Sequence, residues 1–175
     1  MFSNTGVRYG LLGALLVLFY FMLLYGIRQE LFLSPGLQWA SMGIYLLFMW
    51  QAAKVDCQAH GLERDFREIL RTPFVVFLLI NLCYWMFYYA LHLYDPGLIQ
   101  TEMALEIQGI KAQIEAGVGD PQQANLLRDR MNDLEQSLQL PPAQPLGPIV
   151  TRMLIGALGG FSLSAGVAAL QRYKA

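Results

Sequence analysis

The chain has 175 residues, a formal net charge of −1, 55% hydrophobic residues and only 14% charged residues. The charged residues are confined almost wholly to the segments between long apolar stretches, and these stretches lack the polar faces that a soluble helical bundle needs. This composition argues against a soluble protein, and nothing in the chain resembles a surface that binds nucleic acid. We therefore expect the lipid bilayer to be a partner and nucleic acid not to be one.

Four apolar stretches are each long enough to cross a bilayer, because a hydrocarbon core of roughly 30 Å needs about 20 helical residues. Inside lipid every backbone polar group must be satisfied within its own segment, so we expect all four stretches to be helices. The first is longer than the apolar part of a signal peptide and is expected to remain as an anchor. The stretches cover residues 6–27, 36–53, 74–93 and 149–170.

Two of the stretches follow a polar residue and a proline. Ser34-Pro35 precedes the second stretch, and Thr72-Pro73 precedes the third. A serine or threonine at the N-cap and a proline at the first helical position are typical of helix starts. The sequence therefore predicts that helices begin at these two prolines.

The predicted fold is all-α: a four-helix transmembrane bundle with an extramembrane antiparallel helical hairpin between its third and fourth helices. Residues 1–94 should hold the first three membrane helices, with a short cytoplasmic amphipathic segment at residues 54–72. Residues 95–148 should form the extracytoplasmic hairpin, and residues 149–175 the fourth membrane helix and a cytoplasmic tail. Lysine and arginine near the span ends predict a multi-pass protein with both termini in the cytoplasm.

The segment at residues 54–72 has an amphipathic pattern of its own. Its apolar residues fall on one helical face and its arginines point elsewhere, as in helices that lie in a membrane interface near anionic headgroups. The alternative is ordinary topology-setting charge without a specific lipid. The apolar face consists of Leu62, Phe66, Ile69 and Leu70.

The most specific pattern lies between the third and fourth stretches. Two sets of four apolar residues repeat with spacings of four, three and four, and opposing members of the two sets give a constant sum of residue numbers. This is the register of an antiparallel helical hairpin with coiled-coil-like packing. The first set is Met103, Ile107, Ile110 and Ile114, and the second is Leu127, Met131, Leu134 and Leu138.

The residues between the two sets fit a tight turn. Gly117 and Gly119 can end the first helix, and Asp120 with Pro121 can cap and start the second. We interpret the hairpin as a protein–protein docking element. The alternative is a rigid spacer without a partner.

Charged residues beside the apolar sets favour the same register. An antiparallel hairpin places Glu106 near Arg130, and it places Lys111 near Glu135. Both pairs are opposite in charge. Exposed ion pairs contribute little stability, so we expect these two to select the register rather than to stabilise the hairpin.

Small residues recur every four positions in the first and fourth stretches. This spacing lets helix backbones approach closely where burial in lipid supplies no driving force. We expect these residues to pack the first stretch against the fourth, with a homodimer contact or a ligand groove as alternatives. The helix-packing residues are Gly6, Gly10, Gly156, Gly160 and Ser164.

The sequence shows no recognisable catalytic centre, so we expect no enzyme activity and assign no catalytic, cofactor-binding or metal-binding residue. Asp56, Cys57 and His60 come nearest to a metal cluster, but a closed zinc site needs four ligands. Asn81 is the candidate intramembrane polar site. Polar side chains at this depth are costly to bury, and an asparagine there more often joins two helices than binds a substrate.

Short motifs carry a resemblance to a known family. Tyr9-Gly10-Leu11-Leu12-Gly13 opens the first stretch, and Asp56 is followed by Gly61-Leu62-x-x-x-Phe66-Arg67 before the third. With the long helical loop and the glycine-rich last stretch, the chain resembles over essentially its whole length a bacterial membrane family, domain of unknown function 4199. The resemblance implies four transmembrane helices in a bacterial inner membrane and no assigned activity.

These features favour a non-enzymatic integral membrane protein that acts by interaction, either as an accessory subunit of a larger complex or as a homo-oligomer. The hairpin would be its docking element. The alternative is a small carrier or lipid-handling protein that uses Asn81 and the tyrosine-rich third stretch. A solvated cavity that reaches Asn81 would favour the carrier, and a packed interior would favour interaction.

Overall fold

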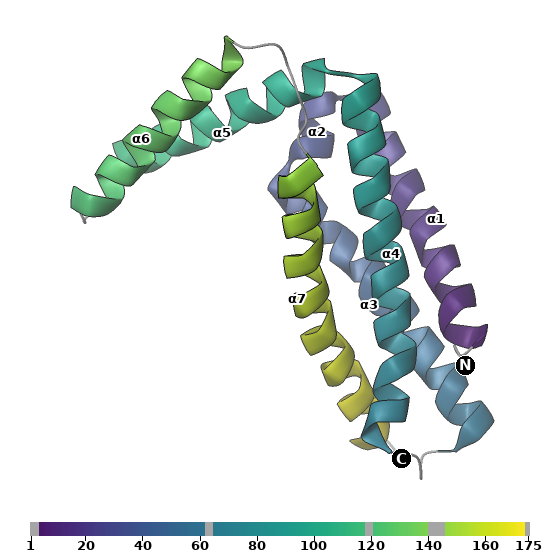
Figure 1. Cartoon of the computed structure of the whole chain (residues 1–175). Helices are drawn as coiled ribbons and strands as arrows, with labels where there is room; N and C mark the ends of the chain where they lie inside the picture. The colour runs from purple at the N-terminus through teal and green to yellow at the C-terminus, as the bar shows by residue number, and fades with distance from the viewer. Residues whose placement is uncertain (1–3, 62–64, 118–120, 140–145, 174–175) are drawn as a thin grey trace. The chain divides into compact units, whose positions relative to one another are not determined.

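The computed structural model describes residues 4–61, 65–117, 121–139 and 146–173. Over these residues the chain forms seven α-helices and no strand (Figure 1). The all-α class predicted from the apolar stretches is therefore confirmed. The helices fall into two compact units, Met1–Tyr89 with Pro145–Ala175 and Ala90–Gln144.

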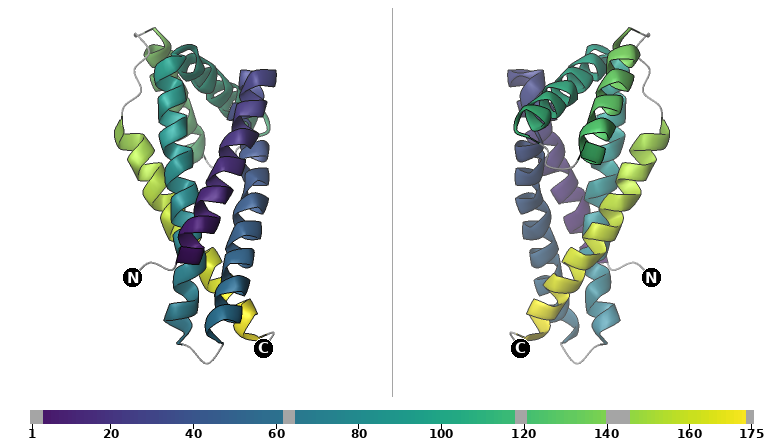
Figure 2. Two further views of the ribbon diagram at one scale, coloured as in Figure 1. Left: turned by 90° about the vertical axis from the view of Figure 1, so that its right-hand side faces the viewer. Right: turned by 90° about the vertical axis from the view of Figure 1, so that its left-hand side faces the viewer.

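The first unit contains helices α1, α2, α3 and α7 and most of α4. Their bounds are α1 Asn4–Ile27, α2 Gln29–Leu33, α3 Pro35–His60, α4 Phe66–Tyr94 and α7 Leu146–Tyr173. α1 lies beside α3, and α7 crosses α3 toward the C-terminal ends of both helices (Figure 2).

Three of these helices are long and apolar enough to cross a membrane. They are Thr5–Ile27, Phe66–Tyr94 and Leu146–Tyr173. α3 is 26 residues long, but its glutamine, tryptophan, tyrosine, lysine and aspartate residues lower its mean hydropathy. The second predicted span, residues 36–53, is thus helical but less apolar than the other three.

Aromatic side chains hold the short helix α2 against α1 and α4. Phe32 of α2 is fully buried, stacks on Tyr88 with ring centroids 5.9 Å apart, and meets Phe21 edge-on at 5.7 Å. Tyr84 continues the cluster, with its ring 4.8 Å from that of Phe21. A helix of five residues is not stable alone, so these ring contacts determine where α2 forms.

Glycines mark close packing in α1 and α7, but both helices pack on α4. A Cβ atom added at Gly10 would lie 2.7 Å from Leu79 Cδ1, and one added at Gly160 would collide with the ring of Phe77. Leu79 and Phe77 both belong to α4. We expected these glycines to pack the first stretch directly against the fourth. That expectation is wrong, because the glycines of both helices contact α4 instead. Ser164 is buried on the same helix as Gly160, and its hydroxyl donates to the Gly160 carbonyl at 2.7 Å.

The helix start predicted at Pro35 is correct, and the one predicted at Pro73 is wrong. α3 begins at Pro35 with Ser34 at the N-cap, although the Ser34 side chain makes no capping hydrogen bond. α4 begins at Phe66 and continues through Pro73, so Thr72 lies inside the helix. Gly6 of α1 packs against this part of α4, where a Cβ atom would lie 3.2 Å from the Thr72 carbonyl oxygen.

The segment at residues 54–72 does not form a helix of its own. Its first part continues α3 as far as His60, and its last part, from Phe66, begins α4; Leu62 and Arg64 lie outside the described residues. The described residues of its apolar face pack within the protein. Ile69 is buried in a cluster with Cys57 and Ala168, and the partly buried Phe66 and Leu70 pack against this cluster.

The second unit is built on α5, Gly97–Glu115, and α6, Pro121–Leu138, which lie side by side (Figure 1). One apolar cluster joins the two helices, and its members are the eight residues that the sequence pattern selects. Ile107, Ile110 and Leu134 are buried in it, and Met103, Ile114, Leu127, Met131 and Leu138 pack against them.

The turn after α5 begins with a glycine in a conformation that other residues rarely adopt. Gly117 has a φ of 80°, the left-handed value that favours glycine at the end of a helix. Gly119 and Asp120 lie outside the described residues, and α6 begins at Pro121. The chain therefore turns between α5 and α6 within a few residues.

Candidate functional site

Two ion pairs flank the apolar cluster of the α5–α6 hairpin. Arg130 Nε donates to Glu106 Oε1 at 3.0 Å, and Lys111 Nζ lies 3.5 Å from Glu135 Oε1. All four side chains are more than a third exposed, so each pair contributes at most a few tenths of a kcal/mol. Their effect is on register, because a shift of either helix would break both pairs.

The hairpin carries a hollow on one side. It has a volume of about 310 Å³ and is lined by Lys111, Ile114, Glu115, Arg128, Met131 and Asn132. Ile114 and Met131 are half-buried, and the charged residues around them are exposed. An apolar centre with a polar rim is the usual composition of a protein–protein contact. On α6 a further large apolar side chain, Leu126, is 68% exposed.

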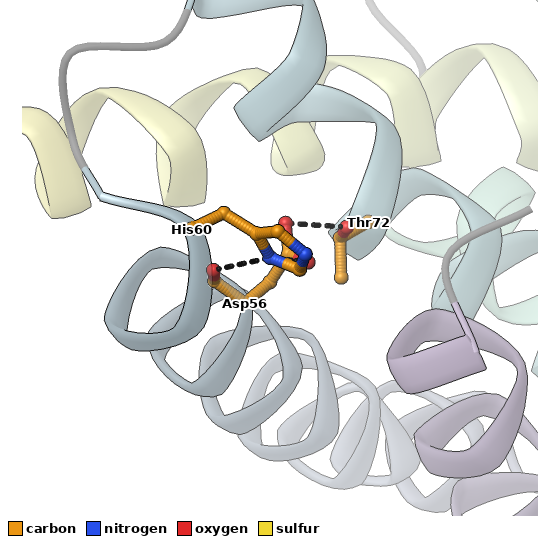
Figure 3. A network of polar contacts seen from close by, with 3 residues as sticks. All are labelled: Asp56, His60 and Thr72. Carbon is orange, nitrogen blue, oxygen red and sulfur yellow. Dashed lines mark hydrogen bonds and ion pairs between the residues drawn. The ribbon is translucent and has the colours of Figure 1, made fainter.

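A polar cluster joins α3 to α4 in the first unit (Figure 3). The Asp56 side chain is only 2% exposed, and its Oδ2 accepts a hydrogen bond from Thr72 Oγ1 at 3.0 Å. His60, one turn further along α3 and 56% exposed, places Nδ1 3.3 Å from Asp56 Oδ1 and 3.1 Å from the Asp56 carbonyl oxygen. A carboxylate is costly to bury unless it is hydrogen-bonded, so these contacts offset part of its desolvation.

Asn81 joins α4 to α7. Its Nδ2 donates to the Met153 carbonyl at 3.1 Å, and its Oδ1 accepts from Trp85 Nε1 at 3.1 Å. Gly156 makes room for it, because a Cβ atom there would lie 3.2 Å from Asn81 Oδ1. The amide is buried, and it uses both of its polar atoms within the protein.

A histidine and a carboxylate meet at the start of the second unit. His92, near the end of α4, has a side chain with 0% exposure, and its Nε2 lies 3.4 Å from Glu102 Oε2 on α5. Asp95 lies between the two helices, and its Oδ1 accepts a hydrogen bond from the Gly97 N–H at 3.1 Å. These contacts join the last turn of α4 to the first turns of α5 within the second unit.

Some of these partners were not accessible from sequence. Asp56 and Thr72 are sixteen positions apart and meet because α3 and α4 fold back on each other. The bond from Trp85 to Asn81 joins residues four positions apart, so helical spacing could have indicated it. Among the residues that the structure describes, no three histidine, cysteine, aspartate or glutamate side chains come together as a metal site.

The fold and the composition of α1, α4 and α7 define a class: an all-helical protein with helices suited to a membrane. A family model described as "Protein of unknown function (DUF4199)" matches residues 6–172. The chain belongs to this family, as the sequence motifs indicated. No curated protein and no solved structure matches the chain.

Proposed function

We propose that this chain is a non-enzymatic integral membrane protein that acts by protein–protein interaction, with the α5–α6 hairpin as its docking element. In this proposal α1, α3, α4 and α7 all cross a bacterial inner membrane, both termini are cytoplasmic, and the hairpin lies outside the membrane. The partner is either a larger membrane complex or a second copy of the chain.

The observation that carries the proposal is the hollow on the hairpin. The hairpin belongs to a compact unit of its own and has its own apolar cluster, so it can present a surface of fixed shape. Its hollow combines two half-buried apolar side chains, Ile114 and Met131, with a rim of both charge signs. A protein segment that inserts one apolar side chain and places polar groups around it would match this surface.

The carrier alternative needs Asn81 to face a solvated cavity. Instead Asn81 bonds to Met153 of α7 and to Trp85 within α4. These contacts support the interpretation that Asn81 links two helices. Its polar atoms are engaged within the protein, so we do not propose transport.

The test is purification of the tagged chain from its native membrane in a mild detergent. An Asn132→Trp variant fills the hollow and should reduce recovery of the partner about tenfold, the effect of roughly 1.4 kcal/mol. The matched control is Asn125→Trp, which puts the same side chain on the same helix, on an exposed residue that does not line the hollow. Equal recovery with both variants would contradict the role of the hollow.

A homo-oligomer is distinguished in the same preparation. Native mass spectrometry of the purified chain gives the number of copies, and the Asn132→Trp variant should lower that number if the partner is a second copy. A wild-type chain that is monomeric and purifies without a stoichiometric partner would refute the proposal.

A further inference from the structure

A second hollow lies in the first unit, beside the beginning of α1. It has a volume of about 520 Å³ and is lined by Thr5, Val7, Arg8, Tyr9, Leu11 and Val55. Val55 belongs to α3 and the other five residues to α1. Three of the lining residues carry hydrogen-bond donors, and the other three are aliphatic. The donors are Thr5, Arg8 and Tyr9.

The structure describes no counterion for the cation in this hollow among residues 4–61, 65–117, 121–139 and 146–173. Arg8 is exposed, and it makes no hydrogen bond or ion pair with any residue that the structure describes. The same holds for Lys54, which precedes the lining residue Val55 and is also exposed. A guanidinium presents planar paired N–H donors that match a phosphate, so Arg8 is free to bind one.

An apolar track continues along α1 from Arg8. Leu12, Leu15 and Phe19 are 46%, 65% and 60% exposed. They follow Arg8 at spacings of four, three and four residues, which places all of them on one face of the helix. At a rise of 1.5 Å per residue the track from Arg8 to Phe19 is about 16 Å long. This is about half of a hydrocarbon core of roughly 30 Å, the depth of one leaflet.

We propose that this hollow binds an anionic phospholipid. The phosphate lies on the Arg8 guanidinium with the Thr5 and Tyr9 hydroxyls as further donors, and one acyl chain runs along Leu12, Leu15 and Phe19. Both parts of the lipid are needed, because Arg8 matches the phosphate and the apolar track matches a chain. The inference depends on α1 crossing the membrane and not on the docking role of the hairpin.

The test is a lipid titration of the purified full chain in detergent, followed by native mass spectrometry. The two lipids are phosphatidylglycerol and phosphatidylcholine with identical acyl chains. Wild type should bind phosphatidylglycerol more tightly. Arg8→Gln should weaken that binding about fivefold, the contribution of one basic residue near an anionic surface. The matched control is Arg67→Gln, which removes an exposed cation that does not line the hollow and should leave the binding unchanged.

A second variant tests the shape of the site while all charges remain. Val55→Trp fills the hollow and should weaken phosphatidylglycerol binding with Arg8 intact. Thermal unfolding of each variant in detergent checks that its fold is retained.

Three results would overturn the proposal. They are equal losses in Arg8→Gln and Arg67→Gln, unchanged binding in Val55→Trp, and displacement of the lipid by inorganic phosphate at equal concentration. Displacement by inorganic phosphate would show that the hollow binds a phosphate ion and does not recognise the acyl chain of a lipid. Release of the chain from membranes by alkaline carbonate would show instead that α1 does not cross the bilayer, a failure separate from that of the hairpin.

Discussion

Asn81 shows how a single amide can stabilise a helix pair in apolar surroundings. A buried amide without partners costs free energy, yet its two polar atoms here meet the Met153 carbonyl and the Trp85 indole N–H. The first bond joins α4 to α7, and the second satisfies an indole that would otherwise need another partner. Asparagine suits this position because it donates and accepts at the same time.

We expect Asn81→Ala to lower the free energy of unfolding by about 1–2 kcal/mol, because it removes the bond between α4 and α7 and leaves the Trp85 N–H without its acceptor. Thermal unfolding of the purified chain in detergent measures the effect. The control is Leu82→Ala, which truncates a side chain that is 43% exposed. If both variants melt at the same temperature, Asn81 does not join the helices.

At the scale of elements, α4 is the helix on which α1 and α7 both pack. The sequence reveals the small residues of α1 and α7, because their four-residue spacing is a local property. It doesn't reveal their partner, since Leu79 and Phe77 are large side chains of a kind common in any apolar helix. The helix start at Thr72-Pro73 also could not be decided from local sequence. The dipeptide fits a helix start, and the burial of Ile69 against α3 and α7 is what extends α4 back to Phe66.

Two adjacent glycines of α7 provide a direct test of this packing. Gly160→Leu should destabilise the protein by about 1–3 kcal/mol or prevent folding, because the new side chain would overlap the Phe77 ring. Gly159→Leu should be tolerated, since no atom lies within 4 Å of a Cβ at that position. The comparison is made by thermal unfolding in detergent. Equal loss in both variants would mean that α7 doesn't approach α4 through Gly160.

The hairpin was the element most accessible from sequence, because its two helices follow each other and share one register. That register predicts that Ile110 faces Met131. A double variant with cysteine at both positions should form a disulfide readily, whereas Ile107→Cys with Met131→Cys, one layer away, should form it poorly. Disulfides need Cα atoms within roughly 7 Å, and non-reducing electrophoresis measures the yield. Equal yields would indicate a hairpin without a fixed register.

At the scale of the whole molecule, hydropathy identifies α1, α4 and α7 as candidate spans, but it is weaker for α3. α3 carries Asp56 and His60 near its end, where a long-range contact with Thr72 satisfies the carboxylate. Local composition can't anticipate such a contact. The sequence thus identifies the polar residues within the helices. It does not predict which of them form contacts, because those contacts depend on how the helices pack.

The proposed topology places the hairpin and the α3–α4 turn on opposite sides of the membrane. Glu115→Cys at the end of α5 should react with an impermeant maleimide in intact cells, because that residue is exposed and would be extracytoplasmic. His60→Cys, at an exposed position at the end of α3, should react only after the membrane is opened. The reverse result would invert the topology. Labelling of both in intact cells would argue that α4 doesn't cross the membrane.

The bond between Asn81 and Met153 can form only late in the synthesis of the chain. Its two residues are 72 positions apart, with the whole hairpin between them. At roughly 5–20 residues per second, a ribosome needs about 4–14 seconds to make the missing acceptor after Asn81 has emerged. During that interval the Asn81 amide lacks its acceptor on α7, and the Phe77 ring lacks its contact with Gly160. A nascent chain halted before α7 should therefore crosslink from position 77 to lipid or to an insertion factor, and the completed chain from position 77 to α7.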